Sequence, residues 1–282
     1  MKIRPSQLAL VAMAAITACS EPPEHLDTRG EISPPRPNEV TFVATEYAFG
    51  GPARIPAGLT TLRMVNRGAE VHWMEMFKVA DGKTVADLLA VLESGQQLPT
   101  WQQLPTWITV AGGPGWIRPG EASNQTAYLE PGHYVLICRF PTADGVPHLD
   151  MGMVSELDVT TASTPAAVEP EADIVIAISD SAFHLSVPIP AGRHTIRVNN
   201  VGSYRHELYI LRLAPGKSIE DYWAWERGGL TGSGRPGQPW GGVTPFEPET
   251  HVWFTATFEP GEYVFGDESW AGPHIFRQVT VR

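Results

Sequence analysis

Two long stretches of this chain repeat one another at a constant offset, and this repeat constrains the fold more than any other feature. The segment YAFGGPARIPAGLTTLRMVNRGAEVH at 47–72 aligns without a gap with SAFHLSVPIPAGRHTIRVNNVGSYRH at 181–206. The likeness continues in three further pairs of segments, which are 76–89 with 210–223, 129–138 with 258–267, and 145–148 with 271–274. Self-similarity on this scale predicts two copies of one folding unit.

Each copy consists of short runs rich in β-branched and aromatic residues, separated by turn sequences such as PAG and EPG. The runs are EVTFVAT, TTLRMVN, HWMEMFKV and HYVLICRF in the first copy, and DIVIAIS, HTIRVNN, ELYILRL and EYVFGD in the second. Short strands at this spacing favour a β-sandwich of the Greek-key type. One helix is predicted in each copy, at 84–95 and 218–229, where Ser or Thr and Asp supply capping starts. We therefore expect an all-β chain of two tandem sandwiches, each with a short helical insertion.

The N-terminus has the features of an export signal. Lys2 and Arg4 precede an apolar run at 8–18 that is too short to span a membrane as a helix. The run ends in ITAC and so resembles the lipobox of bacterial lipoproteins, in which the cysteine, here Cys19, becomes the first mature residue and carries a lipid. Ordinary signal cleavage near Ala18 is the alternative. The resemblance, with Ser20 after the cysteine, implies an exported lipoprotein of the outer membrane, facing the periplasm or the cell surface and touching the membrane through its lipid anchor only.

Composition shifts divide the rest of the chain. Two hydrophilic stretches rich in Pro, Ser, Thr or Glu separate the repeated units from the N-terminus and from each other. The predicted parts are a signal peptide at 1–18, a Pro-rich tether at 19–38, a first domain at 39–160, a linker at 161–172 and a second domain at 173–282.

A lipid on Cys19 would leave the second cysteine, Cys138, without a partner. An unpaired cysteine in an exported protein is buried, bridged to another chain, or a metal ligand. In the first copy, His72 opens one strand, Cys138 ends another, and His148 and Met153 follow in the next loop. Two imidazoles, a thiolate and a thioether are the ligands of a type 1 copper site. Each residue alone also has a structural explanation, such as a buried small hydrophobe for Cys138.

The segment YVLICRFPTADGVPHLDMGM resembles the "YxLxC…DGxPH…GM" ending of bacterial plastocyanin-like proteins, which have the cupredoxin fold and bind blue type 1 copper. The resemblance covers 40–160. It implies a cupredoxin-like fold and one type 1 copper held by His72, Cys138, His148 and Met153. Met151 is the alternative to Met153 as the axial ligand. The Cys-to-His spacing is longer than in plastocyanin or azurin and nearer to that of copper nitrite reductases.

The second copy differs at the ligand positions. His206 aligns with His72 and His274 with His148, but Asp267 stands in place of the cysteine and no methionine follows. A type 1 site is therefore excluded in a degenerate second domain. Two interpretations stay open for His206, Asp267 and His274: a second metal site of two imidazoles and one carboxylate, or a structural remnant held by a His–Asp hydrogen bond.

The net charge of the chain and the residues beside Cys138 limit the functions that the sequence allows. A formal net charge of −11 argues against nucleic acid as a partner, and it would favour binding to a basic redox partner. Multicopper oxidases and nitrite reductases place a histidine before this cysteine, whereas Ile137 and Arg139 flank it here. We therefore expect no substrate turnover. The predicted function is a membrane-tethered exported copper protein that carries single electrons to and from an exported redox partner. The alternative is a non-redox surface-binding or copper-storage module.

Overall fold

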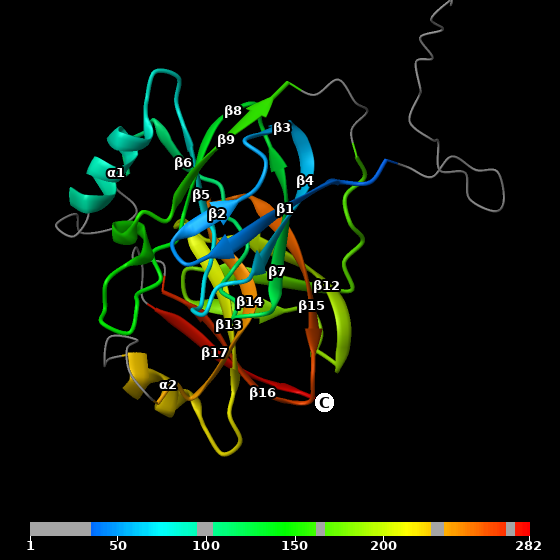
Figure 1. Ribbon diagram of the computed structural model, residues 1–282. Coiled ribbons are helices and arrows are strands. Elements are labelled where there is room, and N and C mark those ends of the chain that lie inside the picture. The colour runs from blue at the N-terminus through cyan, green and yellow to red at the C-terminus, as the bar shows by residue number, and fades with distance from the viewer. Residues whose placement is uncertain (1–34, 95–103, 162–166, 227–233, 269–273) are drawn as a thin grey trace, which may run out of the picture. The chain divides into compact units, whose positions relative to one another are not determined.

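The computed structural model describes residues 35–94, 104–161, 167–226, 234–268 and 274–282 (Figure 1). The predicted signal peptide at 1–18, the lipidation at Cys19 and most of the predicted tether lie outside these residues. The predicted linker at 161–172 lies partly outside them. The domain boundaries therefore stay predictions.

The first copy forms two sheets, which pack on a common core. One has the strand order β2-β1-β4-β7 and the other β3-β9-β8-β5-β6. The strands of the first sheet are β1 Asn38–Thr45, β2 Ala48–Gly50, β4 Gly58–Asn66 and β7 Ala122–Leu129. Those of the second are β3 Arg54–Pro56, β5 Glu75–Val79, β6 Ile108–Val110, β8 Gly132–Ile137 and β9 Val154–Thr160.

The second copy pairs its strands in the corresponding order, β11-β10-β12-β15 in one sheet and β17-β16-β13-β14 in the other, where the described residues form no counterpart of β3. These strands are β10 Ile174–Ser179, β11 Ala182–Leu185, β12 Gly192–Asn200, β13 His206–Leu213, β14 Gly237–Phe246, β15 His251–Phe258, β16 Gly261–Asp267 and β17 Ile275–Val281. Strand β1 runs parallel to β4, and β10 runs parallel to β12 in the same way. The short β3 also pairs parallel to β9, and the other strand pairs are antiparallel. The prediction of an all-β fold with two sandwiches, each with one short helix, is confirmed.

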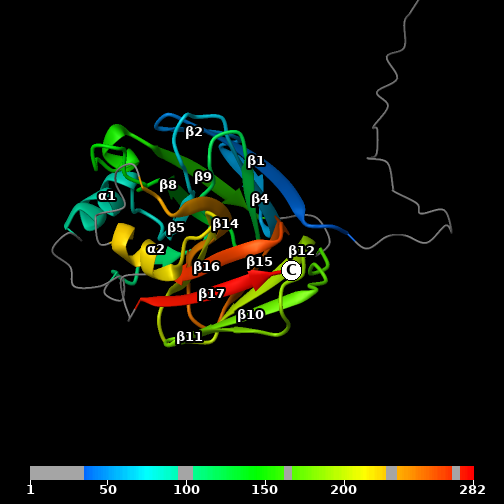
Figure 2. The same ribbon diagram turned by 90° about the horizontal axis from the view of Figure 1, so that it is seen from below.

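Alternating hydrophobicity explains how each sheet faces its core. In β10 the buried side chains are Ile174, Ile176 and Ile178, while the residues between them keep partial exposure. Figure 2 shows β16 and β17 lying across this core from β10 and β11. Residues 134–137 of β8 are instead buried on both faces, because helix α1, Val85–Ser94, covers the outer face through Leu88.

The two predicted helices begin with the same capping arrangement. The Asp87 backbone N–H donates to Thr84 Oγ1, and the Thr84 N–H donates to Asp87 Oδ2 at 2.9 Å. Ser218 and Asp221 repeat this arrangement at the start of α2, Ile219–Glu226. None of the helices in the described ranges is long and apolar enough to cross a membrane.

The two copies share one continuous sheet. Strand β7 pairs with β15 through Thr126 and Trp253, which joins two four-stranded sheets into one of eight strands (Figure 1). The Asn124 side chain extends this junction, since its amide donates to Thr255 O at 2.8 Å and its Oδ1 accepts from Thr255 N at 2.9 Å.

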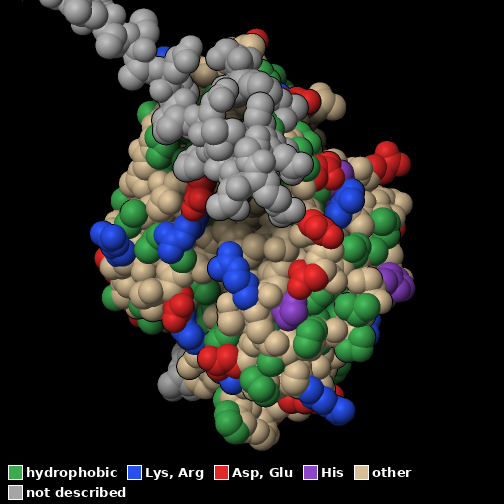
Figure 3. Space-filling view, turned by 90° about the vertical axis from the view of Figure 1, so that its right-hand side faces the viewer, with side chains coloured by type: hydrophobic (Ala, Val, Ile, Leu, Met, Phe, Trp, Pro, Cys, Tyr) green, Lys and Arg blue, Asp and Glu red, His purple; other side chains and the backbone are tan. Residues whose placement is uncertain are grey.

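Charged side chains of both signs are mixed on the face that Figure 3 shows. This face is the right-hand side of Figure 1, and its acidic and basic side chains are interspersed rather than grouped by sign.

A glycine-rich loop of the first copy lies against β14 of the second. Gly112 N donates to Pro245 O and Gly115 N donates to Gly242 O, each at 3.0 Å. Gly113, with φ of 143°, is required here because a Cβ at this position would lie 1.8 Å from Met74 O. The loop therefore contacts Met74, just after His72, on one side and strand β14 of the second copy on the other.

Candidate metal centre

Three sequence-predicted residues reach one point from neighbouring elements. His72 lies just before β5, in a bridge in which its N–H donates to Ile117 O at 3.2 Å. Cys138 follows β8, which pairs antiparallel with β5. His148 begins a short 3-10 helix, His148–Met151, and its N–H donates to Phe140 O at 2.9 Å. Adjacent strand ends and one hydrogen-bonded loop therefore position the three side chains.

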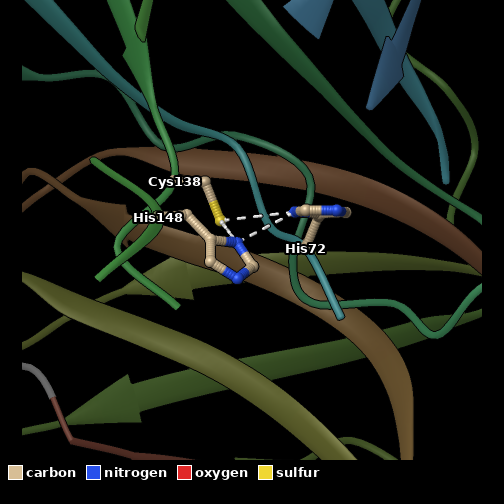
Figure 4. Close-up of side chains that lie close together, drawn as sticks. All are labelled: His72, Cys138 and His148. Carbon is tan, nitrogen blue, oxygen red and sulfur yellow. Dashed lines mark hydrogen bonds between the residues drawn. The ribbon is translucent and has the colours of Figure 1, made fainter. Parts of the chain in front are cut away.

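The donor atoms face one another (Figure 4). Cys138 Sγ lies 3.5 Å from His148 Nδ1 and 3.9 Å from His72 Nδ1, and the two Nδ1 atoms are 3.1 Å apart. All three side chains are fully buried. Within the described part of the chain, these residues form the group of His, Cys, Asp or Glu side chains that could hold a metal ion.

The two candidate axial methionines occupy different environments. Met153 is fully buried in the same core cluster as Cys138, and its carbonyl accepts from the Cys138 N–H at 3.3 Å. Met151 is 50% exposed. Of the two, only Met153 therefore lies in the core that surrounds the thiol.

The Nε2 atoms of His148 and His72, which point away from the thiol, have different surroundings. His148 Nε2 lies 2.7 Å from Glu70 Oε2, so this carboxylate accepts from the ring and leaves Nδ1 directed at the thiol. His72 Nε2 is buried without a hydrogen-bond partner, and a Cβ at Gly68 would lie 2.9 Å from it. Sequence reasoning missed Glu70, although it stands two residues before His72 in the segment GAEVH.

Burial sets the protonation states of the metal-free site. Burial and the nearby His148 lower the pKa of His72 to about 4. Burial also lowers the pKa of His148, although Glu70 opposes that shift. Burial raises the pKa of the Cys138 thiol to about 12, against the backbone N–H groups of Trp73 and Phe140 that donate to the sulfur. At pH 7 both imidazoles are neutral and the thiol is protonated, so binding of a metal by the thiolate would release one proton.

The residues present fit a copper ion. Two imidazole nitrogens and one thiolate in a fully buried centre are the main donors of a blue-copper site. Met153, whose carbonyl accepts from the Cys138 N–H, is the sequence-predicted thioether ligand. The backbone N–H groups that donate to Sγ stabilise the charged sulfur.

The second set of sequence-predicted residues does not assemble in this way. His206 Nδ1 is hydrogen-bonded to Asp267, and its Nε2 lies 3.0 Å from Asp180 Oδ1. His274 is exposed and contacts the ring of Phe276 edge-on. Of the two interpretations, the geometry favours the His–Asp hydrogen bond, because both nitrogens of His206 already have carboxylate partners. In the described ranges His206, Asp267 and His274 do not form a metal-holding group.

Known proteins share limited likeness with this chain. No protein-family model matches it, and no curated protein matches it. Among solved structures, reduced auracyanin from Roseiflexus castenholzii is 21% identical over 44% of this chain and 98% of its own, with a TM-score of 0.32. The blue copper protein auracyanin A from Chloroflexus aurantiacus is 21% identical over 44% of this chain and all of its own, with a TM-score of 0.31. A multicopper oxidase is 14% identical over 92% of each chain, with a TM-score of 0.28.

Proposed function

We propose that this chain is a copper protein that carries single electrons through one type 1 site. The observation that carries this proposal is the convergence of His72 Nδ1, Cys138 Sγ and His148 Nδ1 in a fully buried centre. Copper bound by these donors would supply a one-electron couple between its two common oxidation states. Met153 is the proposed axial ligand because it lies in the same core cluster as Cys138.

The surrounding chain suits electron transfer because it holds the donors in place. Strands β5 and β8 are paired through five residues each, and the loop between Cys138 and His148 is held by Thr142 N to Val146 O and by His148 N to Phe140 O. Tyr47 contacts the ring of His148 edge-on at 5.2 Å between centroids. A site held this firmly changes little between oxidation states, so an electron would move with little rearrangement.

The proposal extends to where the protein acts and with what. Cys19 would carry the lipid, and the tether at 19–38 would connect the folded part to the outer membrane. An exported redox protein with a basic surface is the proposed partner, supported by the net charge of −11. Ile137 and Arg139 beside Cys138 supply no histidine that could lead to a second metal, which supports electron transfer rather than substrate turnover.

Copper loading of the full chain tests this function. We expect one copper(II) per chain and an intense visible absorption from thiolate-to-copper charge transfer, which reductants bleach reversibly. Cys138→Ser should lose that band, whereas Met151→Leu, a change at an exposed residue, should keep it. A colourless protein after copper addition would disprove the type 1 site. Copper binding without the band and without a reversible redox couple would favour the storage alternative.

A further inference from the structure

The outer nitrogen of His72 and the carboxylate of Glu46 border the same small space above Gly68. The Cβ that this glycine lacks would lie 2.9 Å from His72 Nε2 and 3.0 Å from Glu46 Oε1. Within the described residues, Nε2 is buried and has no hydrogen-bond partner. A buried polar atom without a partner is uncommon in proteins, and one that lies this near a carboxylate needs a physical reason.

Glu46 is held in place as a charged group. It lies in the turn between β1 and β2, and its Oε1 accepts from the Ala69 N–H. Hydrogen bonds from the backbone N–H groups of Ala69 and of Glu46 itself lower the pKa of this exposed carboxyl group. Glu46 is therefore ionised at pH 7. Burial and His148 lower the pKa of His72, and the charge of Glu46 opposes them.

The second copy has the same arrangement with the hydrogen bond formed. In the repeat, Asp180 aligns with Glu46. Gly202 aligns in the same way with Gly68. The Cβ that Gly202 lacks would lie 2.3 Å from Asp180 Oδ1 and 2.5 Å from His206 Nε2, and these two atoms are 3.0 Å apart. Both loops need a glycine here, because the carboxylate and the imidazole approach each other over its α-carbon.

A buried asparagine gives the two loops the same shape. Asn66 Oδ1 accepts from the Gly68 N–H at 2.9 Å, and Asn200 Oδ1 accepts from the Gly202 N–H at 3.1 Å. Both asparagines are buried. The glycine is thus placed alike in each copy, so the contact that the second copy makes is sterically open to the first.

The position of the ring proton explains why His72 lacks this contact in the metal-free chain. The Nδ1 atoms of His72 and His148 are 3.1 Å apart, so one of them carries the proton that lies between them. Glu70 accepts from Nε2 of His148 and leaves its Nδ1 as an acceptor, which puts that proton on Nδ1 of His72. Nε2 of His72 then has a lone pair and no proton to donate to Glu46.

We propose that Glu46 accepts the Nε2–H of His72 when the site holds its metal. Ligation through Nδ1 requires a lone pair on that atom, so the ring loses the proton on Nδ1, gains one on Nε2 and stays neutral. Nε2 thereby becomes a buried donor, with the carboxylate across the Gly68 space as its acceptor. Glu46 is thus a positioning residue, which fixes the ring and raises the basicity of Nδ1. It has this role only at the proposed copper site, so the inference rests on the proposed function.

NMR of the imidazole nitrogens tests the position of the proton. Zinc(II) is the probe, since it takes the same nitrogen and sulfur ligands and is diamagnetic. In the full chain, the His72 proton should lie on Nδ1 without metal and on Nε2 with zinc, where it should exchange slowly with water. Glu46→Ala should lose this slow exchange. Glu46→Asp should keep it, because Asp180 reaches its histidine from the aligned position.

Copper affinity, measured by competition with a chelator, tests the same contact. Glu46→Ala should weaken copper(II) binding by about tenfold, and Glu46→Asp should restore most of it. Gly68→Ala, which puts a methyl group between the two side chains, should weaken binding similarly, and combining it with Glu46→Ala should add little. Asp180→Asn changes the aligned carboxylate of the second copy and is the control that should leave copper affinity unchanged.

The outcomes separate this role from the proposed function. An unaltered chain that binds no metal would disprove the copper site itself. Metal binding with unchanged affinity and unchanged proton exchange in Glu46→Ala would overturn the role of Glu46 alone. If a variant does not fold, the zinc-loaded unaltered chain still decides, because fast exchange of the His72 Nε2–H would overturn the role and slow exchange supports it.

Discussion

Glu70 Oε2 lies 2.7 Å from Nε2 of His148, a ring that has no exposed surface. This carboxylate determines which nitrogen of His148 carries the proton, and therefore leaves the lone pair of Nδ1 facing the Cys138 thiol. Glu70 keeps partial exposure, with 34% of its side chain accessible. It stands between the buried ring and solvent.

Removing the Glu70 carboxylate should weaken copper binding. Without an acceptor at Nε2, the ring of His148 loses its orientation and some of its basicity, so Glu70→Ala should lower copper affinity by about tenfold or more. Competition with a chelator of known affinity measures this. Glu156→Gln, a change at an exposed carboxylate outside the site, is the control. Copper affinity unchanged by Glu70→Ala would show that the contact does not position the ring.

The two methionines near the site should respond differently to the same substitution. Met153→Leu removes a thioether from the core around Cys138 at nearly constant volume, so the copper(II) state should lose a donor and the reduction potential should rise. Met151→Leu should leave the potential unchanged, because Met151 is half exposed. Voltammetry of the two copper-loaded variants makes the comparison. A shift in Met151→Leu alone would assign the axial position to Met151.

The His206–Asp267 pair should stabilise the fold most at mildly acidic pH. Burial lowers the pKa of His206, but the hydrogen bonds and charges of Asp267 and Asp180 outweigh burial and raise it above 6.5. A raised pKa contributes stability that is fully present below 6.5 and is lost as pH rises through the folded value. Asp267→Asn should therefore lower the free energy of unfolding by about 3 kcal/mol at pH 6 and by less at pH 9.

Urea unfolding of the unaltered chain and of Asp267→Asn at the two pH values checks this sign. Asp173→Asn gives a comparison at a second His–Asp pair, in which the half-exposed carboxylate of Asp173 contacts His194. A difference for Asp267→Asn that grows with pH would contradict the prediction.

The Asn124 side chain should contribute measurably to the junction of the two copies. Asn124→Ala would remove the partners of both Thr255 N and Thr255 O, so it should lower the free energy of unfolding by about 2 kcal/mol. Asn124→Asp keeps the acceptor for Thr255 N but turns a carboxylate oxygen toward Thr255 O, and this repulsion should make its effect at least as large. Chemical denaturation of the three proteins gives the ranking, and equal stability of Asn124→Ala and the unaltered chain would rule out this role.

Much of the secondary structure could be predicted from local sequence, because several strands alternate simply between buried and exposed residues and both helices begin with capping residues. The alternation in β10 and the capping residues of α1 and α2 follow from neighbours in the chain. Strand β14 could not be predicted in this way, since its sequence GQPWGGVTPF contains two prolines and three glycines. It forms a strand because it lies at the edge of its sheet, where Pro239 and Pro245 are tolerated.

Sequence reasoning found the site from the spacing of Cys138, His148 and Met153 in the first copy, and the repeat supplied the comparison with the second copy. Aligning the copies placed His206 opposite His72 and Asp267 opposite Cys138. The structure brings His72 close to Cys138 in the first copy and His206 close to Asp267 in the second. Glu70 and Asp180 were missed, because their contacts depend on how loops fold over the ends of the strands. Glu46 was missed for the same reason, since it approaches His72 only across the glycine of the folded loop.

The pairing of β7 with β15 also affects the solubility of the protein. An outermost strand displays a row of unsatisfied amide and carbonyl groups, which recruits other chains into aggregates. Here each sandwich covers this vulnerable border of the other. A single sandwich cut from the chain would regain an open border and tend to self-associate. Joining the two sandwiches in one chain thus keeps one edge of each sheet covered by the other, which favours solubility.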